Sequence, residues 1–273
     1  MMIRESHRLF KTNFPIIGVV HLLPLPGSPG FKGSIKEIMG RALSDVEALL
    51  EGGVDGIIVE NFGDAPFPKN HIPDESLSLF SIIAHEIRKI LPEDFPLGIN
   101  VLRNCTTQAV ILAYNVNANF IRINIPVGAF LTPSGIIESQ IREAALKRKE
   151  LGAEKIYFFE DVMVKHAWPI TDEKEIEGWV KETEERGLAD VLIVSGRHTG
   201  EEVDVEHLKR VKTFSRKPVI IGSGLNEKNV EILIGYADGA IVGTFFEKDM
   251  IPGNPVEQWK VARLMEKVKT LRR

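Results

Sequence analysis

The stretch PVIIGSGLNEKNVEILIGYADGAIVGT at residues 218–244 contains the pattern that decides the fold. Two short apolar runs, 218–223 and 238–243, flank a segment that we expect to be helical over 226–236. Each run is nearly continuously apolar, which is typical of a parallel strand that is covered on both faces. Two such strands joined by a helix predict a right-handed βαβ unit.

The same pattern repeats toward the N-terminus. Comparable apolar runs occur at residues 16–21, 55–60, 96–101, 119–124, 155–160 and 190–195. Helical segments are predicted at residues 34–52, 74–91, 138–151, 171–187, 204–214 and 255–269. Eight strands in this rhythm predict an α/β protein with a single closed (β/α)₈ TIM barrel over residues 1–273. A doubly wound sheet is the alternative, but the Gly-rich nucleotide turn that it needs is replaced by HLLPLPGSPG at 21–30.

Composition and charge narrow the range of functions. The chain has 273 residues, of which 44% are hydrophobic and 26% charged, as in a globular protein with a substantial core. Its net charge of −4 argues against binding to nucleic acid or to an anionic membrane. The single cysteine, Cys105, excludes an internal disulfide and favours a reducing, cytoplasmic location.

The N-terminal region resembles a secretory signal only superficially. Basic residues precede an apolar run at 16–25, but this run contains His21, is interrupted by Pro24 and the following Pro26, and precedes no cleavage pattern. We therefore interpret it as the first buried strand, and we expect no transmembrane segment because no apolar run is long enough. Many barrels form homo-oligomers, and such an assembly is an open expectation for this chain.

The loops after the last two predicted strands have the composition of a phosphate-binding site. A phosphate is held by backbone N–H groups, and glycine allows the backbone to approach it closely. In TIM barrels this site commonly lies in the loops after strands 7 and 8. The residues predicted to form it are Gly222, Ser223, Gly224, Gly243 and Thr244. Tight barrel turns are the alternative explanation of these glycines.

Polar side chains follow the other six predicted strands, where barrel enzymes place their chemistry. Candidate catalytic residues are His21, Glu60, Asp64 and Asp161, because neighbouring carboxylates can divide acid and base roles. Carboxylates could equally hold a divalent metal, so the cofactor is left open, and core packing or loop bracing is the alternative for each. Candidate substrate-binding residues are Asn61, Asn100, Arg103, Asn104, Arg122, Asn124, Lys165, His166, Ser195 and Thr199. Covalent chemistry at Lys165 is an alternative that we weigh less, since a neighbouring carboxylate would keep it protonated.

Several motifs resemble those of the BtpA family. They are GVVHLLPLPGSPGFKG (18–33), GVDGIIVENFGDAPF (53–67), GINVLRN (98–104), DVMVKHA (161–167), IGSGLNEKNV (221–230) and DGAIVGT (238–244). The resemblance implies a phosphate-binding barrel of the ribulose-phosphate-binding type. In photosynthetic bacteria it implies a role in photosystem I accumulation, termed membrane complex biogenesis, although relatives occur in organisms without photosynthesis. The chain departs from the family pattern at Cys105, where an acidic residue is expected, and at residues 245–247, where a basic stretch is expected.

The sequence supports two hypotheses of different classes. The first is an enzyme that acts on a phosphorylated sugar or nucleoside-like metabolite by acid–base or metal-assisted chemistry. The second is a non-catalytic assembly or regulatory factor, which requires an exposed apolar surface. Trp259 and the Phe245–Phe246 pair are the candidates for that surface, and burial in the core is the favoured alternative for both.

Overall fold

Eight parallel strands form the closed barrel that the sequence predicts. The computed structural model describes residues 9–170, 175–196 and 200–272. The strands, in their order around the barrel, are β1 (Ile16–His21), β2 (Gly56–Glu60), β3 (Leu97–Asn100), β4 (Phe120–Ile123), β7 (Tyr157–Asp161), β9 (Val191–Val194), β10 (Val219–Ile221) and β11 (Ala240–Val242). Strands β11 and β1 pair in parallel, so the first and last strands close the ring.

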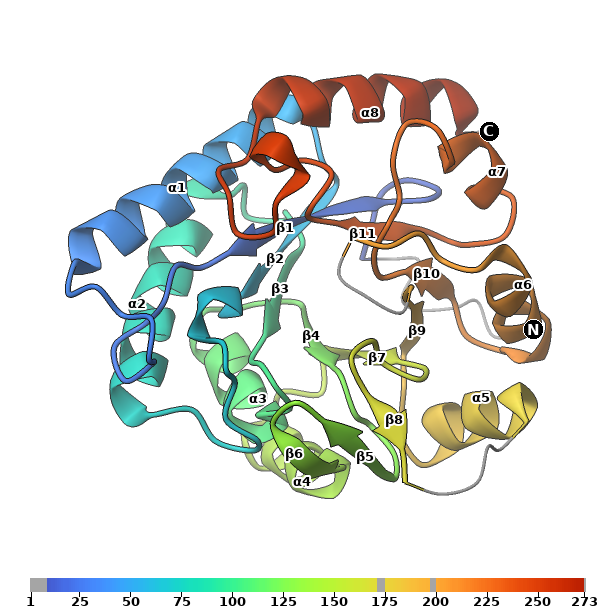
Figure 1. Cartoon of the computed structure of the whole chain (residues 1–273), viewed down its shortest axis with the longest axis horizontal. Coiled ribbons are helices and arrows are strands. Elements are labelled where there is room, and N and C mark those ends of the chain that lie inside the picture. Colours follow the sequence, from blue (N-terminus) through green and yellow to red (C-terminus); the bar gives the residue numbers. More distant parts are fainter. Residues whose placement is uncertain (1–8, 171–174, 197–199, 273) are drawn as a thin grey trace.

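Helices surround the barrel on its outside (Figure 1). They are α1 (Ile35–Gly52), α2 (Asp74–Ile90), α3 (Thr106–Asn115), α4 (Ile141–Glu150), α5 (Ile176–Glu185), α6 (Val205–Phe214), α7 (Val230–Leu233) and α8 (Gln258–Leu271). Short 3₁₀ helices, η2 (Phe62–Asp64) and η3 (Lys248–Met250), follow β2 and β11. No helix in the described part of the chain is both long enough and apolar enough to cross a membrane.

The structure differs from the sequence expectations in three helical regions. The segment expected to be helical from residue 138 begins as a strand, because β5 (Ala129–Thr132), β6 (Gly135–Glu138) and β8 (Trp168–Pro169) form a small antiparallel sheet. The helix expected over 226–236 shrinks to α7, because the Asn226 side chain accepts hydrogen bonds from the N–H groups of Lys228 and Asn229 and holds a turn. Helix α3 was not predicted, since its face is too evenly apolar to show a clear periodicity.

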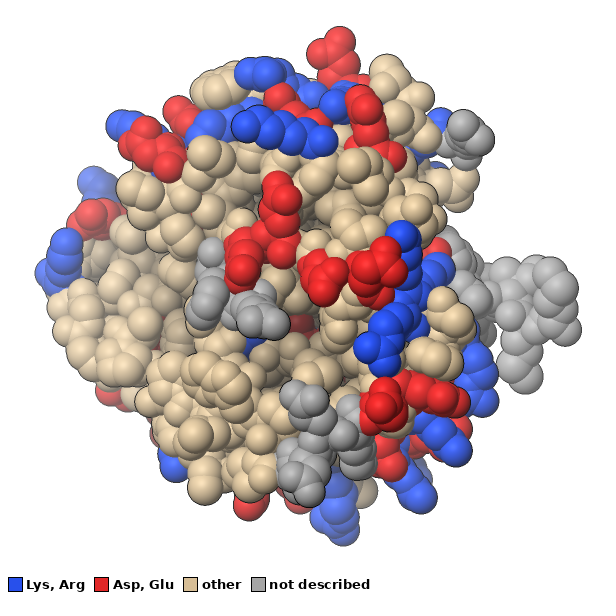
Figure 2. All heavy atoms as spheres, turned by 45° about the vertical axis from the view of Figure 1, so that its right-hand side comes forward, with Lys and Arg blue, Asp and Glu red and all other residues tan. Residues whose placement is uncertain are grey.

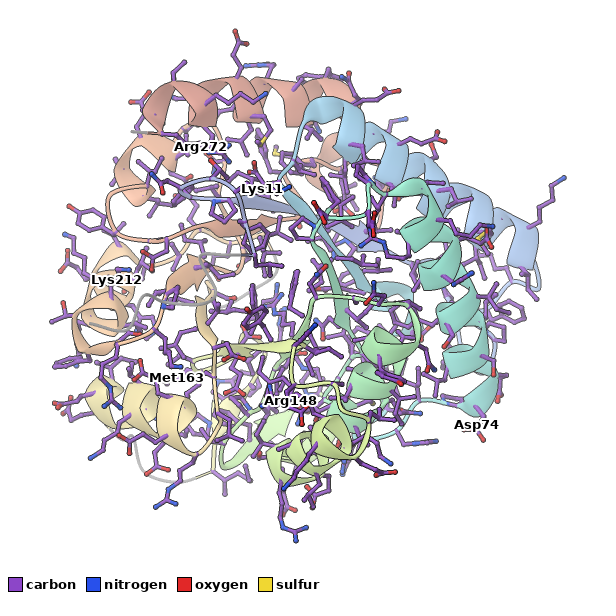
Figure 3. All side chains as sticks on the ribbon, turned by 180° about the vertical axis from the view of Figure 1, so that it is seen from behind. Lys11, Asp74, Arg148, Met163, Lys212 and Arg272 are labelled. Atoms are coloured by element: carbon purple, nitrogen blue, oxygen red, sulfur yellow. The ribbon has the colours of Figure 1, made fainter. Side chains whose placement is uncertain are left out.

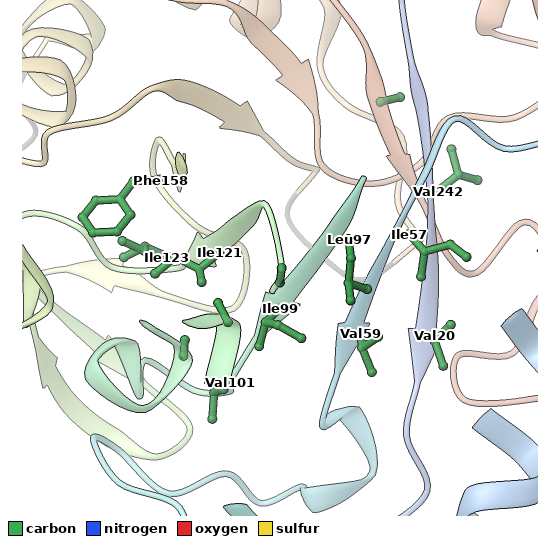
Figure 4. Packing of buried hydrophobic residues seen from close by; sticks show 14 of the residues in the cluster. Val20, Ile57, Val59, Leu97, Ile99, Val101, Ile121, Ile123, Phe158 and Val242 are labelled. Carbon is green, nitrogen blue, oxygen red and sulfur yellow. The ribbon is translucent and has the colours of Figure 1, made fainter. Parts of the chain in front are cut away.

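Alternation along the strands produces two apolar layers. One layer fills the space between strands and helices and includes Val20, Ile57 and Val59 (Figure 4). The other fills the barrel interior and includes Ile17, Val19 and Ile58. Because successive strand residues face opposite sides, the residues that follow the inner apolar layer also point into the barrel. This alternation directs His21 and Glu60, the next inward positions of β1 and β2, toward the barrel mouth.

Polar side chains just before every second strand form hydrogen bonds that stabilise the end of the barrel opposite the mouth. Asp55, just before β2, accepts a hydrogen bond from the N–H of Ile16 at 2.8 Å, which satisfies the first amide of β1. Three more residues do the same for the strand before their own: Asn119 for Leu97, Asp190 for Phe158, and Asp238 for Val219. The three aspartates form ion pairs with Arg272, Arg148 and Lys212, which lie around the barrel seen from behind (Figure 3). These contacts stabilise the amino-terminal end of the barrel, whereas the polar residues at the opposite end, the mouth, are available for chemistry.

Candidate active site at the barrel mouth

A cavity of about 560 Å³ opens at the carboxyl ends of the strands. Acidic side chains gather beside a hollow on the face drawn in Figure 2, and Glu202 and Glu227 are among the residues that line the cavity. Nine of the residues predicted from the sequence line it as well: His21, Glu60, Arg122, Lys165, Gly222, Ser223, Gly224, Gly243 and Thr244. The topology therefore brings residues from β1, β2 and β4, from the turn after β7, and from the loops after β10 and β11 around one space.

Arg122 of β4 is the centre of the charged network. Its Nε and Nη2 donate to the two oxygens of Asp161 at 2.9 Å each, which is the bidentate geometry that suits a guanidinium. Its Nη1 lies 3.4 Å from Glu60 Oε1. Arg122 is 4% exposed, and the two carboxylates raise its pKa although burial opposes this. The guanidinium is therefore permanently charged and already shared between two acids.

Glu60 is a buried carboxylate that remains ionised. Burial is the largest influence and would raise its pKa, but the positive charges of Arg122 and His21 outweigh it and lower the pKa overall. The neighbouring Asn100 amide adds to this lowering, without the geometry of a full hydrogen bond. A carboxylate that keeps its charge inside a cavity can accept a proton from a bound ligand.

His21 is oriented by a carboxylate from the far end of the chain. Its Nδ1 lies 2.7 Å from Glu247 Oε1, and its Nε2 lies 3.9 Å from Glu60 Oε2. Glu247 is fully buried, and the same oxygen accepts a hydrogen bond from the Gly253 N–H at 3.0 Å. A histidine that donates from Nδ1 to a carboxylate presents Nε2 to the cavity, which is the arrangement that general acid–base catalysis requires.

Lys165 extends from the turn after β7 into the cavity. Burial is the main cause that lowers its pKa, to about 8, and the positive charges of Arg122 and Arg103 act in the same direction. Glu60 and Asp161 oppose the shift only partly. The main chain at Lys165 is held in place because its carbonyl accepts a hydrogen bond from the Arg103 guanidinium.

The predicted phosphate loops form a concave backbone surface in the same cavity. The N–H groups of Ser223, Gly224, Gly243 and Thr244 donate no backbone hydrogen bond to any residue that the structure describes. The Ser223 hydroxyl is buried and likewise has no described partner. At Gly222 a Cβ would lie 2.3 Å from Ser195 Oγ, and Gly224 has a φ of +79°, so both positions need glycine. This surface can receive the oxygens of an anion.

Four other predicted residues brace the loops around the mouth and do not line the cavity. Asp64 accepts from the Leu25 N–H at 2.8 Å and from Asn61 Nδ2 at 2.9 Å, and Asn61 in turn accepts from the Leu102 N–H at 2.7 Å. Asn104 accepts from the Ile125 N–H at 2.9 Å. Arg103 holds the carbonyl of Lys165. The structure thus separates Asp64 from Glu60, which the sequence placed together as an acid–base pair.

Of the remaining predicted residues, Asn100, Asn124 and Ser195 lie next to the charged network. Asp161 accepts from Asn124 Nδ2 at 2.9 Å and lies 3.4 Å from Ser195 Oγ. Both amide atoms of the buried Asn100, and Oδ1 of Asn124, lack a hydrogen-bond partner among the described residues. His166 follows Lys165 in the turn and does not line the cavity. Thr199 lies outside the described residues.

Two features of the site were missed or left open by the sequence. Glu247 was noted only as a departure from a basic stretch; the one signal that could identify it is the closure of β11 against β1, which brings it to His21 across 226 positions of sequence. Candidate metal ligands were left open, and within the described residues no group of three or more His, Cys, Asp or Glu side chains is arranged to hold a metal ion.

Comparison with known proteins places the chain in a family. A model of the BtpA family matches residues 12–270. The chain belongs to the BtpA family. An uncharacterized protein of Pyrococcus abyssi is 46% identical over 258 residues, covering 94% of this chain and 97% of its own. The photosystem I biogenesis protein BtpA of Synechocystis is 39% identical over 263 residues, covering 96% of this chain and 90% of its own.

Solved structures share the barrel of this BtpA-family chain at low sequence identity. N-(5′-phosphoribosyl)anthranilate isomerase from Pyrococcus furiosus has a TM-score of 0.58 at 16% identity, covering 94% of this chain and 99% of its own. KGPDC from Streptococcus mutans has a TM-score of 0.56 at 10% identity, covering 95% and 99% respectively. These neighbours confirm the TIM-barrel prediction.

Proposed function

We propose that this chain is an enzyme that binds a phosphorylated small molecule, such as a sugar phosphate, at its barrel mouth. The observation that carries the proposal is a set of donors around the cavity that have no partner among the described residues: four N–H groups and the buried Ser223 hydroxyl. An anion can satisfy several such N–H groups at once, together with the buried Ser223 hydroxyl. The Pyrococcus furiosus neighbour is named for a phosphoribosyl compound, which supports the same ligand class.

The reacting part of the ligand would lie against the charged side of the cavity. Glu60 is the proposed base, because it is ionised and buried. His21 is the proposed proton carrier, because Glu247 fixes its ring and leaves Nε2 toward Glu60. Asp161 is proposed to position Arg122, and Asp64 to brace the loop after β2 rather than to react. The free thiol of Cys105 is consistent with activity in a reducing, cytoplasmic compartment.

A thermal-shift experiment tests the phosphate site. Ribose 5-phosphate and inorganic phosphate should raise the melting temperature of the wild-type chain, with ribose as the control, because a ligand that binds the folded state stabilises it. Ser223→Ala and Thr244→Val should each reduce this shift. Ser78→Ala, on the outer helix α2, is the matched control and should keep it. Absence of any shift with phosphate compounds, with or without Mg²⁺, would overturn the proposal.

The acid–base roles are tested with any compound that the thermal screen identifies. In deuterated water, NMR follows both conversion of the compound and exchange of its carbon-bound hydrogens. Glu60→Gln should abolish both and leave the thermal shift in place. Asp64→Asn should lower the melting temperature because it weakens the loop contacts, while exchange continues. Unchanged turnover in Glu60→Gln would remove that residue from catalysis.

An apolar patch favours a second candidate function, assembly of a membrane complex. The outer face of the small sheet exposes Leu131, Ile136 and Trp168, which are 52%, 52% and 61% exposed and pair across the strands. Of the candidates named from the sequence, Phe246 is buried and Phe245 lines the cavity, whereas Trp259 of α8 is 50% exposed. The name of the Synechocystis relative motivates this proposal.

Complementation of a deletion strain separates the two functions. The enzymatic proposal requires that Trp168→Ser restores growth and Glu60→Gln does not. The assembly proposal requires the reverse, together with loss of membrane complexes on native gels.

A further inference from the structure

We propose that Lys165 forms a Schiff base with the carbonyl group of a phosphorylated aldehyde or ketone bound in the cavity. The inference rests on the proposed phosphate site and adds the class of substrate and a covalent step. It starts from the position of Lys165, which lines the same cavity as the phosphate loops. A ligand whose phosphate contacts Ser223 and Gly224 can therefore present its carbon chain to the lysine.

The carboxylates near Lys165 are engaged elsewhere. Asp161 gives both oxygens to Arg122, and Glu60 lies between Arg122 and His21. Among the described residues, none forms a hydrogen bond or an ion pair with Lys165 Nζ. Glu60 and Asp161 therefore favour the ammonium form of Lys165 without holding its Nζ in an ion pair, and they offset the lowering of its pKa only in part.

The electrostatic environment makes the free amine available. Burial, Arg122 and Arg103 lower the pKa of Lys165 to about 8. At pH 7 about one molecule in ten then carries the neutral amine, whereas an ordinary lysine, with a pKa near 10.4, has roughly one in several thousand. Because only the neutral amine is nucleophilic, the site raises the reactive fraction by about two orders of magnitude.

The covalent step balances with groups that the cavity holds. The Lys165 amine attacks the carbonyl carbon, a proton moves from nitrogen to oxygen, and a carbinolamine forms. Protonation of its hydroxyl by His21 releases water and leaves a cationic iminium. The iminium carries the positive charge that the ammonium would have carried, beside Glu60 and Asp161. No oxidant or reductant is needed.

The Lys165 main chain is held in a way that suits this role. The Arg103 guanidinium holds the Lys165 carbonyl, so the turn is tied to the segment after β3. Arg103 is itself 6% exposed and contributes positive charge near the amine. Arg103 is therefore a positioning residue in this proposal.

Reductive trapping tests the inference. The full chain is incubated with sodium cyanoborohydride and D-glyceraldehyde 3-phosphate, dihydroxyacetone phosphate or ribose 5-phosphate, and the adduct is mapped by peptide mass spectrometry. We expect one adduct at Lys165 with at least one compound, more than tenfold above the unphosphorylated sugar, and suppressed by inorganic phosphate. Lys165→Arg should abolish it while keeping the melting temperature. Lys89→Arg, which changes a lysine of α2 that does not line the cavity, should leave it unchanged.

The outcomes separate this inference from the phosphate site. A thermal shift with phosphorylated compounds but no adduct at Lys165 would overturn the Schiff base and leave the phosphate site standing. Adducts spread over surface lysines, equal with and without the phosphate group, would also overturn it. Absence of both the shift and the adduct would overturn both proposals.

Discussion

Replacement of Arg122 by methionine should reveal how strongly the barrel mouth depends on one cation. Methionine fills a similar volume but leaves Glu60 and Asp161 without the charge between them. Removing one partner of a buried ion pair costs roughly 3–5 kcal/mol, because the remaining charge stays buried and uncompensated. Arg122 is 4% exposed and serves two carboxylates, so we expect the upper part of this range.

The loss should depend on pH in a direction that Glu60 sets. In the wild type the pKa of Glu60 is lowered, so its contribution to stability is present above the unfolded pKa and is lost as the pH falls through the folded pKa. In Arg122→Met the positive charge that mainly offsets the effect of burial is gone, so the pKa of Glu60 rises. Ionised Glu60 then destabilises the variant at neutral pH, and protonation relieves it. The difference in stability between the wild type and the variant should therefore become smaller from pH 8 toward pH 4.

Calorimetric melting temperatures at several pH values provide the assay. For a domain of this size each kcal/mol shifts the melting temperature by roughly 2–4 °C, so the loss at pH 8 should be about 10 °C. Arg122→Lys should lower the melting temperature less, since lysine keeps the positive charge and loses only the bidentate hydrogen bonds of the guanidinium. Adding Glu60→Gln to Arg122→Met should recover part of the loss. A gap that is constant across pH, or no recovery in the double variant, would refute the reasoning.

Three further predictions concern other parts of the chain. Burial and Asp190 raise the pKa of Glu160, so its contribution to stability is lost as the pH rises above the pKa of the unfolded state. Glu160→Gln should therefore have a higher melting temperature than the wild type at pH 8 and the same melting temperature near pH 4. Equal melting temperatures at pH 8 would contradict this. Gly224→Ala should lower the melting temperature more than Gly33→Ala does. Both glycines have a positive φ, but only at Gly224 would the added Cβ lie 2.1 Å from a carbonyl oxygen. Equal decreases in melting temperature would disprove the steric argument. Burial raises the pKa of Cys105 to about 12, so thiol reagents should label it only on unfolding, and rapid labelling of the native chain would count against its burial.

The fold was predictable because its signals are local and repeated. All eight barrel strands lie within a few residues of the apolar runs, since each run must be buried on both faces. The small sheet of β5, β6 and β8 was missed because its strands have only two to four residues and because β8 is far in sequence from the β5–β6 hairpin. The prediction of one domain over residues 1–273 and that of a homo-oligomer stay predictions.

The site was predictable only as a set of positions. The rule that chemistry follows the strand ends selects Glu60 and Asp64 equally, since they are four residues apart. Their roles differ because β2 ends with Glu60 pointing inward, while η2 turns Asp64 toward the Leu25 N–H. Orientation of this kind depends on the local turn and on tertiary contacts, and sequence spacing does not encode it. Glu247 was missed for the same reason, because only barrel closure brings it to His21.

The phosphate site and the reactive lysine oppose each other electrostatically, and this opposition can be measured. A bound phosphate adds negative charge to the cavity of Lys165, which favours the ammonium and raises the pKa of the lysine. The N–H groups of the loops offset part of this charge, since they are dipoles directed at the anion. The pH at which reductive trapping reaches half its maximal rate should therefore be higher for glyceraldehyde 3-phosphate than for glyceraldehyde, whose inflection should lie near the free-enzyme pKa of about 8. Equal inflections would mean that phosphate and lysine do not share one cavity, and the Schiff base would lose its link to the phosphate loops.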